Sequence, residues 1–321
     1  MRQRAGALAI IVCILMSAAG SARAAEQQTL TIFAAGTLAV PIKALDEIFQ
    51  REHPAVTVQP IFGGSVMMAK RLTELHQPAD LIAVADFSVI PKYLFRQGGA
   101  PRYADWYAGF ARNAVTFVYT DKSKYAAEVT PANWYEVLAR PGVEIGRADP
   151  DTDPSGYQTV QMLSLAEKLY DSPGLAARIL ANAPRTNMRD TETALISALQ
   201  LGQIDYLAIY RSDALQHRFR HLDLPAKIDL SDANEAAFYA NGVAHTKNGD
   251  LAAKPIVYAA TIPRNAEHRD LAEAYLRLLL GPDGQEVMAR NGFRPVAPAY
   301  AANMDEVPAP LRAQLTPWPG S

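Results

Sequence analysis

Two stretches near the start of the chain constrain its fold most. In "LTIFAAGTLAVP" an apolar run ends at Gly36-Thr37, where a helical pattern begins. About thirty residues later, "VTVQPIFGGSVMMAK" runs from an alternating pattern through Gly63-Gly64-Ser65 into another helical pattern. A strand that ends in glycine and a hydroxyl residue at the start of a helix is typical of α/β proteins. The repetition predicts parallel strands joined by right-handed helical crossovers.

The rest of the chain continues this alternation. "ADLIAVAD" predicts a third strand, followed by the helix "SVIPKYLFRQGG". Further strands are expected at "AVTFVYTD", "VEIGRAD", "IDYLAIY" and "PIVYAATIP". A long amphipathic helix is expected after "TDPSGY", and closing helices are expected to break at Gly281-Pro282. The Pro-rich tail "PAPLRAQLTPWPG" is expected to be a surface strap.

The first 24 residues have the features of a secretory signal peptide. Arg2 and Arg4 precede the apolar run "AGALAIIVCILMSAAG", which is too short to span a membrane, and "SARAA" offers small residues for cleavage. The sole cysteine, Cys13, lies within this segment. We therefore expect an exported, periplasmic, cysteine-free protein that needs no disulfide.

The remaining 297 residues suffice for two lobes with their own cores. The signal carries three arginines and no acid, so its removal takes the formal net charge from −2 to −5. This charge argues against binding to nucleic acid or to an anionic membrane surface.

The small and hydroxyl residues at the strand ends suggest a binding site. In open α/β sheets, ligands bind where strands end and helices begin. A helix N-terminus offers free N–H groups and the positive end of its dipole, and glycine allows close approach to the backbone. The turns at Thr37 and Ser65 could therefore hold an anion, although each alone also fits an ordinary capped helix start.

The chain lacks the motifs of several enzyme classes. It has no G-x-S-x-G, no G-x-G-x-x-G and no Walker A ending, since "GGSVMMAK" lacks Gly-Lys-Ser/Thr. An exported two-lobed enzyme stays as a remote alternative, but no nucleophile–base pair or metal triad supports it. We expect no enzymatic activity and no cofactor.

A family resemblance extends over nearly the whole mature chain. "GPDGQEVMARNGFRPV" resembles the closing helix of type II periplasmic binding proteins that feed ABC importers. "FAAGTLAVP", "GGSVMMAK", "ADLIAVADFSVIP", "GRADPDTDPSGYQT" and "DYLAIYRSDA", in this order, resemble the archaeal type of tungstate/molybdate-binding protein. The resemblance implies two lobes, each a mostly parallel sheet flanked by helices.

The resemblance also implies the site residues. In that subfamily, hydroxyls and N–H groups of the two early turns hold the oxyanion, two carboxylates approach its metal centre, and a tyrosine closes the site. By motif these positions are Thr37 and Ser65, then Asp153 and Glu192 toward the Mo/W centre, and Tyr210. Thr37 stands where the family usually has Ser, and the stretch between Asp153 and Glu192 is shorter than in archaeal members.

From the residues alone, Asp153 is a turn acid before a proline and Glu192 a first-turn helix acid. A carboxylate beside a dianion is repulsive, by about 1 kcal/mol per charge pair at about 4 Å in water. Mo(VI) or W(VI), unlike sulfur or phosphorus, can accept further oxygen ligands. The same carboxylates would then disfavour sulfate and phosphate. A receptor for sulfate, phosphate or another small oxyanion is the alternative.

The resemblance implies a discontinuous first lobe, residues 25–113 plus 258–321, and a second lobe, residues 114–257. Two crossings would act as a hinge, and a ligand that touches both lobes would favour the closed form. The implied partners are an ABC permease and its ATPase, and the protein itself is expected to be a monomer.

Overall fold

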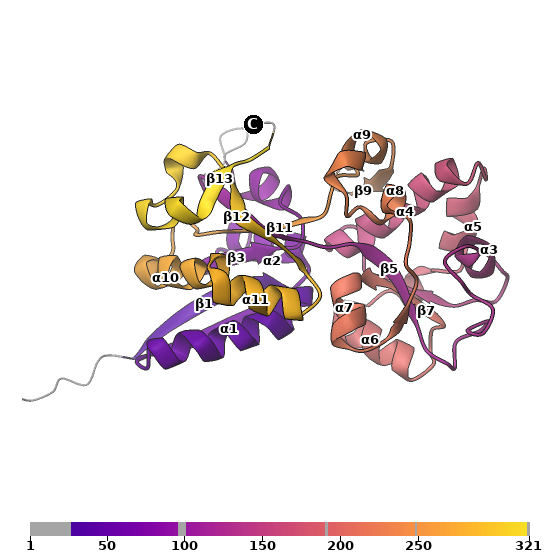
Figure 1. Cartoon of the computed structure of the whole chain (residues 1–321), viewed down its shortest axis with the longest axis horizontal. Helices are drawn as coiled ribbons and strands as arrows, with labels where there is room; N and C mark the ends of the chain where they lie inside the picture. Colours follow the sequence, from indigo (N-terminus) through magenta and orange to yellow (C-terminus); the bar gives the residue numbers. More distant parts are fainter. Residues whose placement is uncertain (1–26, 96–100, 190–191, 248, 320–321) are drawn as a thin grey trace, which may run out of the picture.

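A computed structural model of the chain describes residues 27–95, 101–189, 192–247 and 249–319, with the backbone alone at 192–193. The expected signal peptide lies outside these residues. Figure 1 shows two bodies side by side, each with its own sheet. We call them the first lobe, which holds a seven-stranded sheet, and the second lobe, which holds a four-stranded sheet. Among the described residues, no helix has both the length and the apolar character needed to cross a membrane.

The seven-stranded sheet has the order β13-β12-β4-β11-β3-β1-β2. Its strands are β1 (Gln28–Ala35), β2 (Val56–Gly63), β3 (Leu81–Val84), β4 (Tyr107–Arg112), β11 (Val257–Thr261), β12 (Arg294–Ala302) and β13 (Leu315–Pro317). Its main helices are α1 (Ala39–Glu52), α2 (Ser65–Thr73), α10 (Arg269–Leu280) and α11 (Pro282–Arg290). The break between α10 and α11 falls at Gly281-Pro282, as the sequence predicts.

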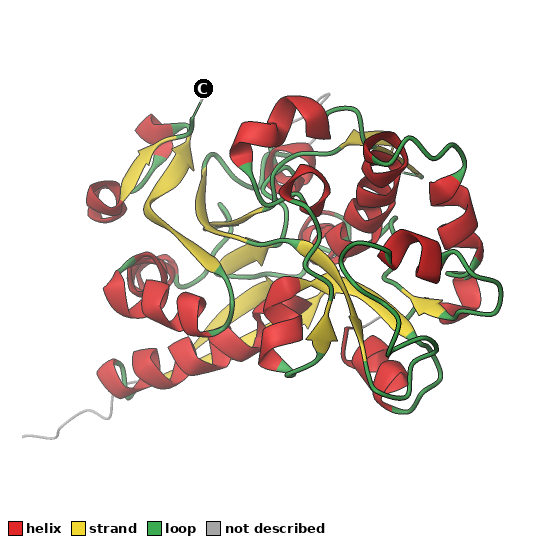
Figure 2. Ribbon diagram, turned by 45° about the vertical axis from the view of Figure 1, so that its right-hand side comes forward, coloured by secondary structure: helices red, strands yellow, loops and turns green. Residues whose placement is uncertain are grey.

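The four-stranded sheet has the order β6-β7-β5-β8. Its strands are β5 (Val115–Tyr119), β6 (Ile145–Gly146), β7 (Tyr206–Tyr210) and β8 (Arg220–His221). The accompanying helices are α3 (Trp134–Leu138), α4 (Pro154–Leu169), α5 (Leu175–Ala181), α6 (Glu192–Gln200), α7 (Arg211–Gln216), α8 (Ala226–Asp229) and α9 (Ala236–Tyr239), and β9 (Val243–Thr246) pairs with β10 (Gly249–Ala252). Figure 2 shows helices flanking the strands of both lobes.

The two-lobed α/β fold agrees with the sequence prediction, but the sheets are mixed rather than mostly parallel. β1 pairs in parallel with β2 and β3, whereas β11 runs antiparallel to both β3 and β4. In the second lobe, β5 is antiparallel to β7 and β8. The reason is that β4, β5 and β11 carry the chain between the sheets, so they are not joined to their neighbours by helical crossovers.

The tail also differs from the expected surface strap. Residues 315–317 form β13, which pairs in parallel with β12 at the edge of the sheet. Trp318 packs against Phe87, with ring centroids 4.7 Å apart. A Cβ added to Gly109 would lie 2.6 Å from the Trp318 ring. The absent side chain at Gly109 therefore makes room for the tail.

We propose the lobe boundaries expected from the sequence, residues 25–113 with 258–321 and residues 114–257. β4 ends at Arg112 in one sheet and β5 begins at Val115 in the other. β11 brings the chain back at Val257. We call residues 112–115 and 256–258 the crossing segments.

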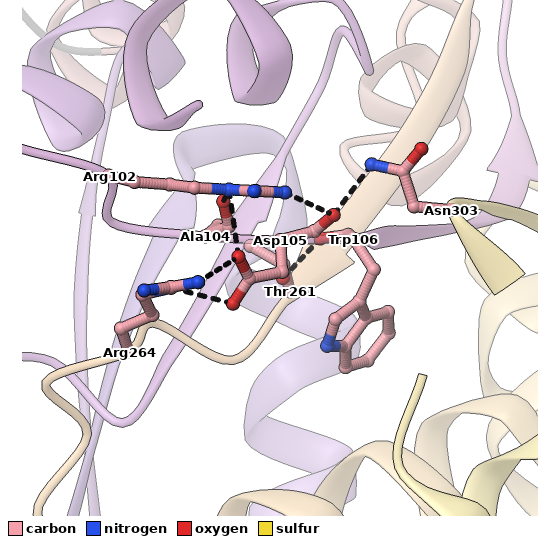
Figure 3. A network of polar contacts seen from close by, with 7 residues as sticks. All are labelled: Arg102, Ala104, Asp105, Trp106, Thr261, Arg264 and Asn303. Atoms are coloured by element: carbon pink, nitrogen blue, oxygen red, sulfur yellow. Dashed lines mark hydrogen bonds and ion pairs between the residues drawn. The ribbon is translucent and has the colours of Figure 1, made fainter. Parts of the chain in front are cut away.

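The far end of the β4–β11 pair is fixed by a polar network (Figure 3). Arg264 binds both carboxylate oxygens of Asp105, at 2.7 and 2.6 Å, and Arg102 lies 2.7 Å from the same carboxylate. The hydroxyl of Thr261 donates to the carbonyl of Trp106. The network therefore joins the segment before β4 to the end of β11, at the end of the strand pair that is away from the crossing segments.

Candidate functional site

A cleft of about 570 Å³ lies between the lobes. The first lobe contributes the turns after β1 and β2, and the second lobe contributes the N-terminal part of α4 and one side of α6. The lining residues are Gly36, Ala39, Val40, Lys43, Phe62, Gly63, Gly64, Ala148, Asp149, Thr152, Asp153, Ser155, Arg189, Leu195, Ile196, Ser197, Gln200, Gln216 and His217. Its volume fits a small-molecule site.

The two turns singled out in the sequence lie side by side. β1 and β2 pair in parallel so that Ala35 is opposite Gly63. The chain therefore enters α2 at Ser65 next to the point where Gly36–Leu38 begins the other helical segment. Both helix starts present first-turn N–H groups at the same edge of the sheet.

The hydroxyls of both turns are held by neighbours. Oγ1 of Thr37 lies 2.9 Å from the hydroxyl of Tyr258 on β11. Oγ of the fully buried Ser65 accepts a 2.9 Å hydrogen bond from the N–H of Ala85, which follows β3. Because this bond uses a lone pair of Ser65, its hydroxyl proton is left to be donated elsewhere.

Across the cleft, Asp153 is the N-cap of α4. Its Oδ1 accepts hydrogen bonds from the N–H and the hydroxyl of Ser155, at 2.8 and 2.7 Å. Pro154 occupies the first helical position, where its missing N–H costs nothing. Burial raises the pKa of the Asp153 carboxyl, and the hydrogen bonds from Ser155 oppose this rise.

The lobes touch where the turn after β2 meets the turn before α4. A Cβ built on Gly64 would lie 2.5 Å from the carbonyl oxygen of Thr152 and 3.0 Å from Oδ2 of Asp153. The N–H of Met67 donates to the same Thr152 carbonyl at 3.4 Å. The second turn of the first lobe is therefore in contact with the carboxylate turn of the second lobe, and this contact requires glycine at position 64.

Tyr210, at the end of β7, is buried beside this contact. Its hydroxyl donates a 2.6 Å hydrogen bond to Oε1 of Gln158 on α4. Its ring meets that of Tyr258 edge to face, with centroids 5.9 Å apart. Burial raises the pKa of Tyr210 well above its usual value, and the charge of Asp153 adds to the rise. Tyr210 therefore stays a neutral hydrogen-bonding group.

A buried polar network connects the turn after β1 to the crossing segments. Nδ2 of Asn113 donates to Oγ of Ser212 at 2.8 Å and to the hydroxyl of Tyr258 at 3.3 Å. Since Tyr258 also contacts Thr37, the contacts run from the buried hydroxyl of Thr37 through the crossing to α7. Any movement of the lobes about the crossing must act on this network.

The comparisons with known proteins agree with this geometry. Residues 30–294 match the family described as "Bacterial extracellular solute-binding protein". The chain belongs to this family. Its members are solute-binding proteins, and the two lobes with an intervening cleft provide a place for a solute.

Curated relatives of this solute-binding protein cover most of its length. The "Molybdate/tungstate-binding protein WtpA" of Pyrococcus abyssi is 36% identical over 314 residues, which cover 88% of this chain and 90% of the relative. WtpA of Thermococcus kodakarensis is 34% identical over 309 residues, 87% of this chain and 85% of the relative. An uncharacterized solute-binding protein of Petrotoga mobilis is 36% identical over 88% of each chain.

Solved structures share the fold at low sequence identity. The periplasmic molybdate-binding protein of Azotobacter vinelandii has a TM-score of 0.60 at 18% identity, covering 82% of this chain and 98% of that one. The sulfate-binding protein SubI of Mycobacterium tuberculosis has a TM-score of 0.58 at 14% identity, covering 84% and 87%. These likenesses confirm the periplasmic binding protein fold.

Of the five residues expected from sequence, Asp153 lines the cleft, whereas Thr37, Ser65 and Tyr210 are buried and are not among the lining residues. Thr37 and Ser65 come from the first lobe, and Asp153 and Tyr210 come from the second. Glu192 begins α6, and its side chain lies outside the described residues. Leu195 and Ser197 of the same helix line the cleft.

The sequence analysis missed several residues around the cleft. Asn113 and Tyr258 are 145 residues apart in sequence and meet only after both crossings form. Lys43 and Arg189 add positive charge to the lining. Arg189 donates to the carbonyls of Thr186 and Met188 at 2.6 and 2.8 Å, which fixes its position. No local motif marks any of these residues.

Proposed function

We propose that this protein captures tungstate, molybdate or both in the interlobe cleft and delivers the oxyanion to an ABC permease with its ATPase. The 34–36% identity to WtpA proteins over most of both chains supports this ligand class. The proposal includes export to the periplasm after removal of residues 1–24, a monomeric state and no resident cofactor.

The observation that carries the proposal is the contact between Gly64 and Asp153. It brings the start of α2, with its first-turn N–H groups, close to a carboxylate of the other lobe, and the buried Ser65 belongs to the same helix start. Amide and hydroxyl donors suit the oxygens of a tetrahedral oxyanion. A carboxylate beside them would repel a sulfate or phosphate dianion.

The carboxylate is useful only if it bonds to the centre of the oxyanion. Mo(VI) and W(VI) are hard centres that accept further oxygen ligands. We propose Asp153 and Glu192 as those ligands, with Thr37, Ser65 and Tyr210 around the oxyanion. The raised pKa of Asp153 means that its ionised form is costly in the empty site, and a high-valent metal centre would offset this cost.

Calorimetric titration of the protein lacking residues 1–24 tests the proposal. Tungstate, molybdate, sulfate and phosphate are titrated in parallel into ligand-stripped protein. We expect one-to-one binding of the first two and no binding heat from the others. Asp153→Ala and Glu192→Ala should each weaken tungstate binding. Tight sulfate or phosphate binding, or unchanged tungstate affinity in the double variant, would refute the carboxylate assignment.

A further inference from the structure

A second cavity, of about 450 Å³, lies at the crossing and shares no lining residue with the cleft. Arg112 at the end of β4 and Arg294 at the start of β12 are opposite each other in the first-lobe sheet. Arg211 at the start of α7 and the segment from Leu222 to Asp232 come from the second lobe. The cavity therefore spans both lobes.

The cavity lies on the other side of the crossing segments from the buried network of Asn113, Ser212 and Tyr258. Arg112 and Ala114 line it, whereas Asn113 between them bonds to Tyr258 and Ser212. Likewise Arg211 lines it, and the next residue, Ser212, belongs to the network. This alternation is expected for extended chain, where successive side chains face opposite ways.

The arginines of this cavity have hydrogen-bonding capacity to spare. Nη2 of Arg112 donates to the Tyr300 hydroxyl at 2.8 Å, but its Nε is buried without a hydrogen-bond partner. Among the described residues, Arg112, Arg211 and Arg294 form no ion pair at contact distance, and the charge of Arg294 lowers the pKa of Asp229 against the larger effect of burial. A buried donor without a partner carries a free-energy cost that a bound acceptor would remove.

The cavity also has three acids, of which Asp223 lies 3.6 Å from His221, while Asp229 and Asp232 accept hydrogen bonds from nearby residues. The carboxylate of Asp229 accepts from the N–H and the hydroxyl of Ser231, at 2.8 and 3.0 Å. Asp232 accepts from the N–H of Asn234 at 2.9 Å. Because each carboxylate oxygen has more than one lone pair, Asp229 and Asp232 could also accept from a ligand's hydroxyl or ammonium group.

We propose that this cavity binds a small organic anion that also carries hydroxyl or amino groups. Its acidic group would bond to the guanidinium groups of Arg112, Arg211 and Arg294, and its donor groups would face Asp229 and Asp232. The volume falls within the range of small-molecule sites. Because the lining comes from both lobes, the ligand favours the present arrangement, in which Gly64 contacts Asp153, and so tightens binding in the cleft.

The test uses the full mature protein and known probes. Glycerate and glycerol 3-phosphate supply the acidic group as carboxylate or phosphate, and glycerol is the neutral control. Binding is followed by NMR titration of ligand-stripped protein, so the readout is independent of the proposed oxyanion function. We expect one of the two acids to bind and glycerol not to bind. Arg211→Gln and Arg294→Gln should each weaken binding at least about tenfold.

Arg178→Gln is the matched control, since Arg178 is an exposed arginine of the second lobe outside the cavity. It should leave probe binding unchanged, and thermal unfolding should show that all three variants fold. Absence of binding by either acid, or binding that survives both cavity variants, overturns the site. A bound probe that leaves tungstate affinity unchanged overturns the coupling to the cleft.

Discussion

The hydroxyl of Tyr157 donates a 2.6 Å hydrogen bond to Oδ2 of Asp86. Asp86 follows β3 in the first lobe, and Tyr157 lies on α4 in the second. Tyr157 comes four residues after Asp153, so both side chains lie on the same face of the helix start. One element, the start of α4, therefore positions both this interlobe hydrogen bond and the carboxylate proposed to bind the ligand.

Tyr157→Phe should weaken tungstate binding without destabilising either lobe. The lost hydrogen bond has a carboxylate acceptor and forms only when the lobes meet. We therefore expect the binding free energy to weaken by about 1–2 kcal/mol, which is roughly a 5- to 30-fold loss of affinity. Calorimetry gives the affinity, and thermal unfolding checks the fold. Tyr170→Phe is the matched control, because Tyr170 accepts a hydrogen bond from Trp134 within the second lobe. Equal affinity losses in the two variants would contradict the interlobe role.

Gly64→Ala should hinder the approach of the lobes. Gly64 has φ −58° and ψ 136°, which alanine adopts freely, so the first lobe should fold normally. The added methyl would lie 2.5 Å from the Thr152 carbonyl, so relief of this overlap should cost about 1–3 kcal/mol of binding, or roughly 5- to 150-fold. Tungstate titration measures this loss.

The adjacent Gly63→Ala is the matched comparison, because Gly63 also lines the cleft but an added methyl there has Met68 and Met67 as its nearest neighbours, not the second lobe. Its methyl would meet the flexible end of Met68, in the same lobe, at 2.7 Å. That side chain can move aside without displacing the second lobe. A Gly64→Ala protein that binds tungstate as tightly as Gly63→Ala would show that the lobes need not come this close.

The local patterns in the sequence predict β1, β2, β3, β5, β7 and β11, but they predict neither β4 nor β12. The apolar runs before Gly36 and Gly64 are strands, and the Gly281-Pro282 break is where the sequence places it. Strand direction is less predictable, because β4 and β11 enter the sheet from crossings between lobes. The periodicity of a strand does not say whether it runs parallel or antiparallel to its neighbours in the sheet.

The site is predictable only in part, for a related reason. Thr37 and Ser65 can be found because each lies at a strand end with its own glycine. Asp86 and Tyr157 are a lone acid and a lone tyrosine in the sequence, and 71 residues separate them. Only the contact between the two lobes brings their side chains together.

Asp153→Asn should change how tungstate binding depends on pH. Burial raises the pKa of Asp153, so this carboxyl takes up a proton at a higher pH than an exposed aspartate. If the ionised form bonds to the metal centre, wild-type affinity falls as pH drops through the raised pKa. The ratio of wild-type to Asp153→Asn affinity should then be largest near neutral pH and shrink in acid. The ratio of the two affinities cancels the effect of tungstate's own protonation, which is the same for both proteins. A ratio that stays constant with pH would contradict the role of the carboxylate.

Asp46→Asn should remove a pH dependence of folding stability that is unrelated to the ligand. Asp46 on α1 accepts a 2.8 Å hydrogen bond from Tyr275 on α10, and only 8% of it is exposed. Burial raises the pKa of Asp46 from 3.8 to about 6, although the Tyr275 bond opposes the rise. Between these values the folded state holds the proton more tightly than the unfolded state.

The stabilisation from the protonated Asp46 is therefore complete below about pH 3.8 and is lost as pH rises through about 6. A shift of this size corresponds to about 3 kcal/mol. The test is the free energy of unfolding in urea, measured between pH 4 and 7. For wild type it should fall with rising pH relative to Asp46→Asn. The side-chain carbonyl of this variant can still accept the hydrogen bond from Tyr275. Glu52→Gln, at an exposed site of the same helix, should show no such difference. Parallel curves for wild type and Asp46→Asn would mean that Asp46 is already ionised in the folded protein at acidic pH.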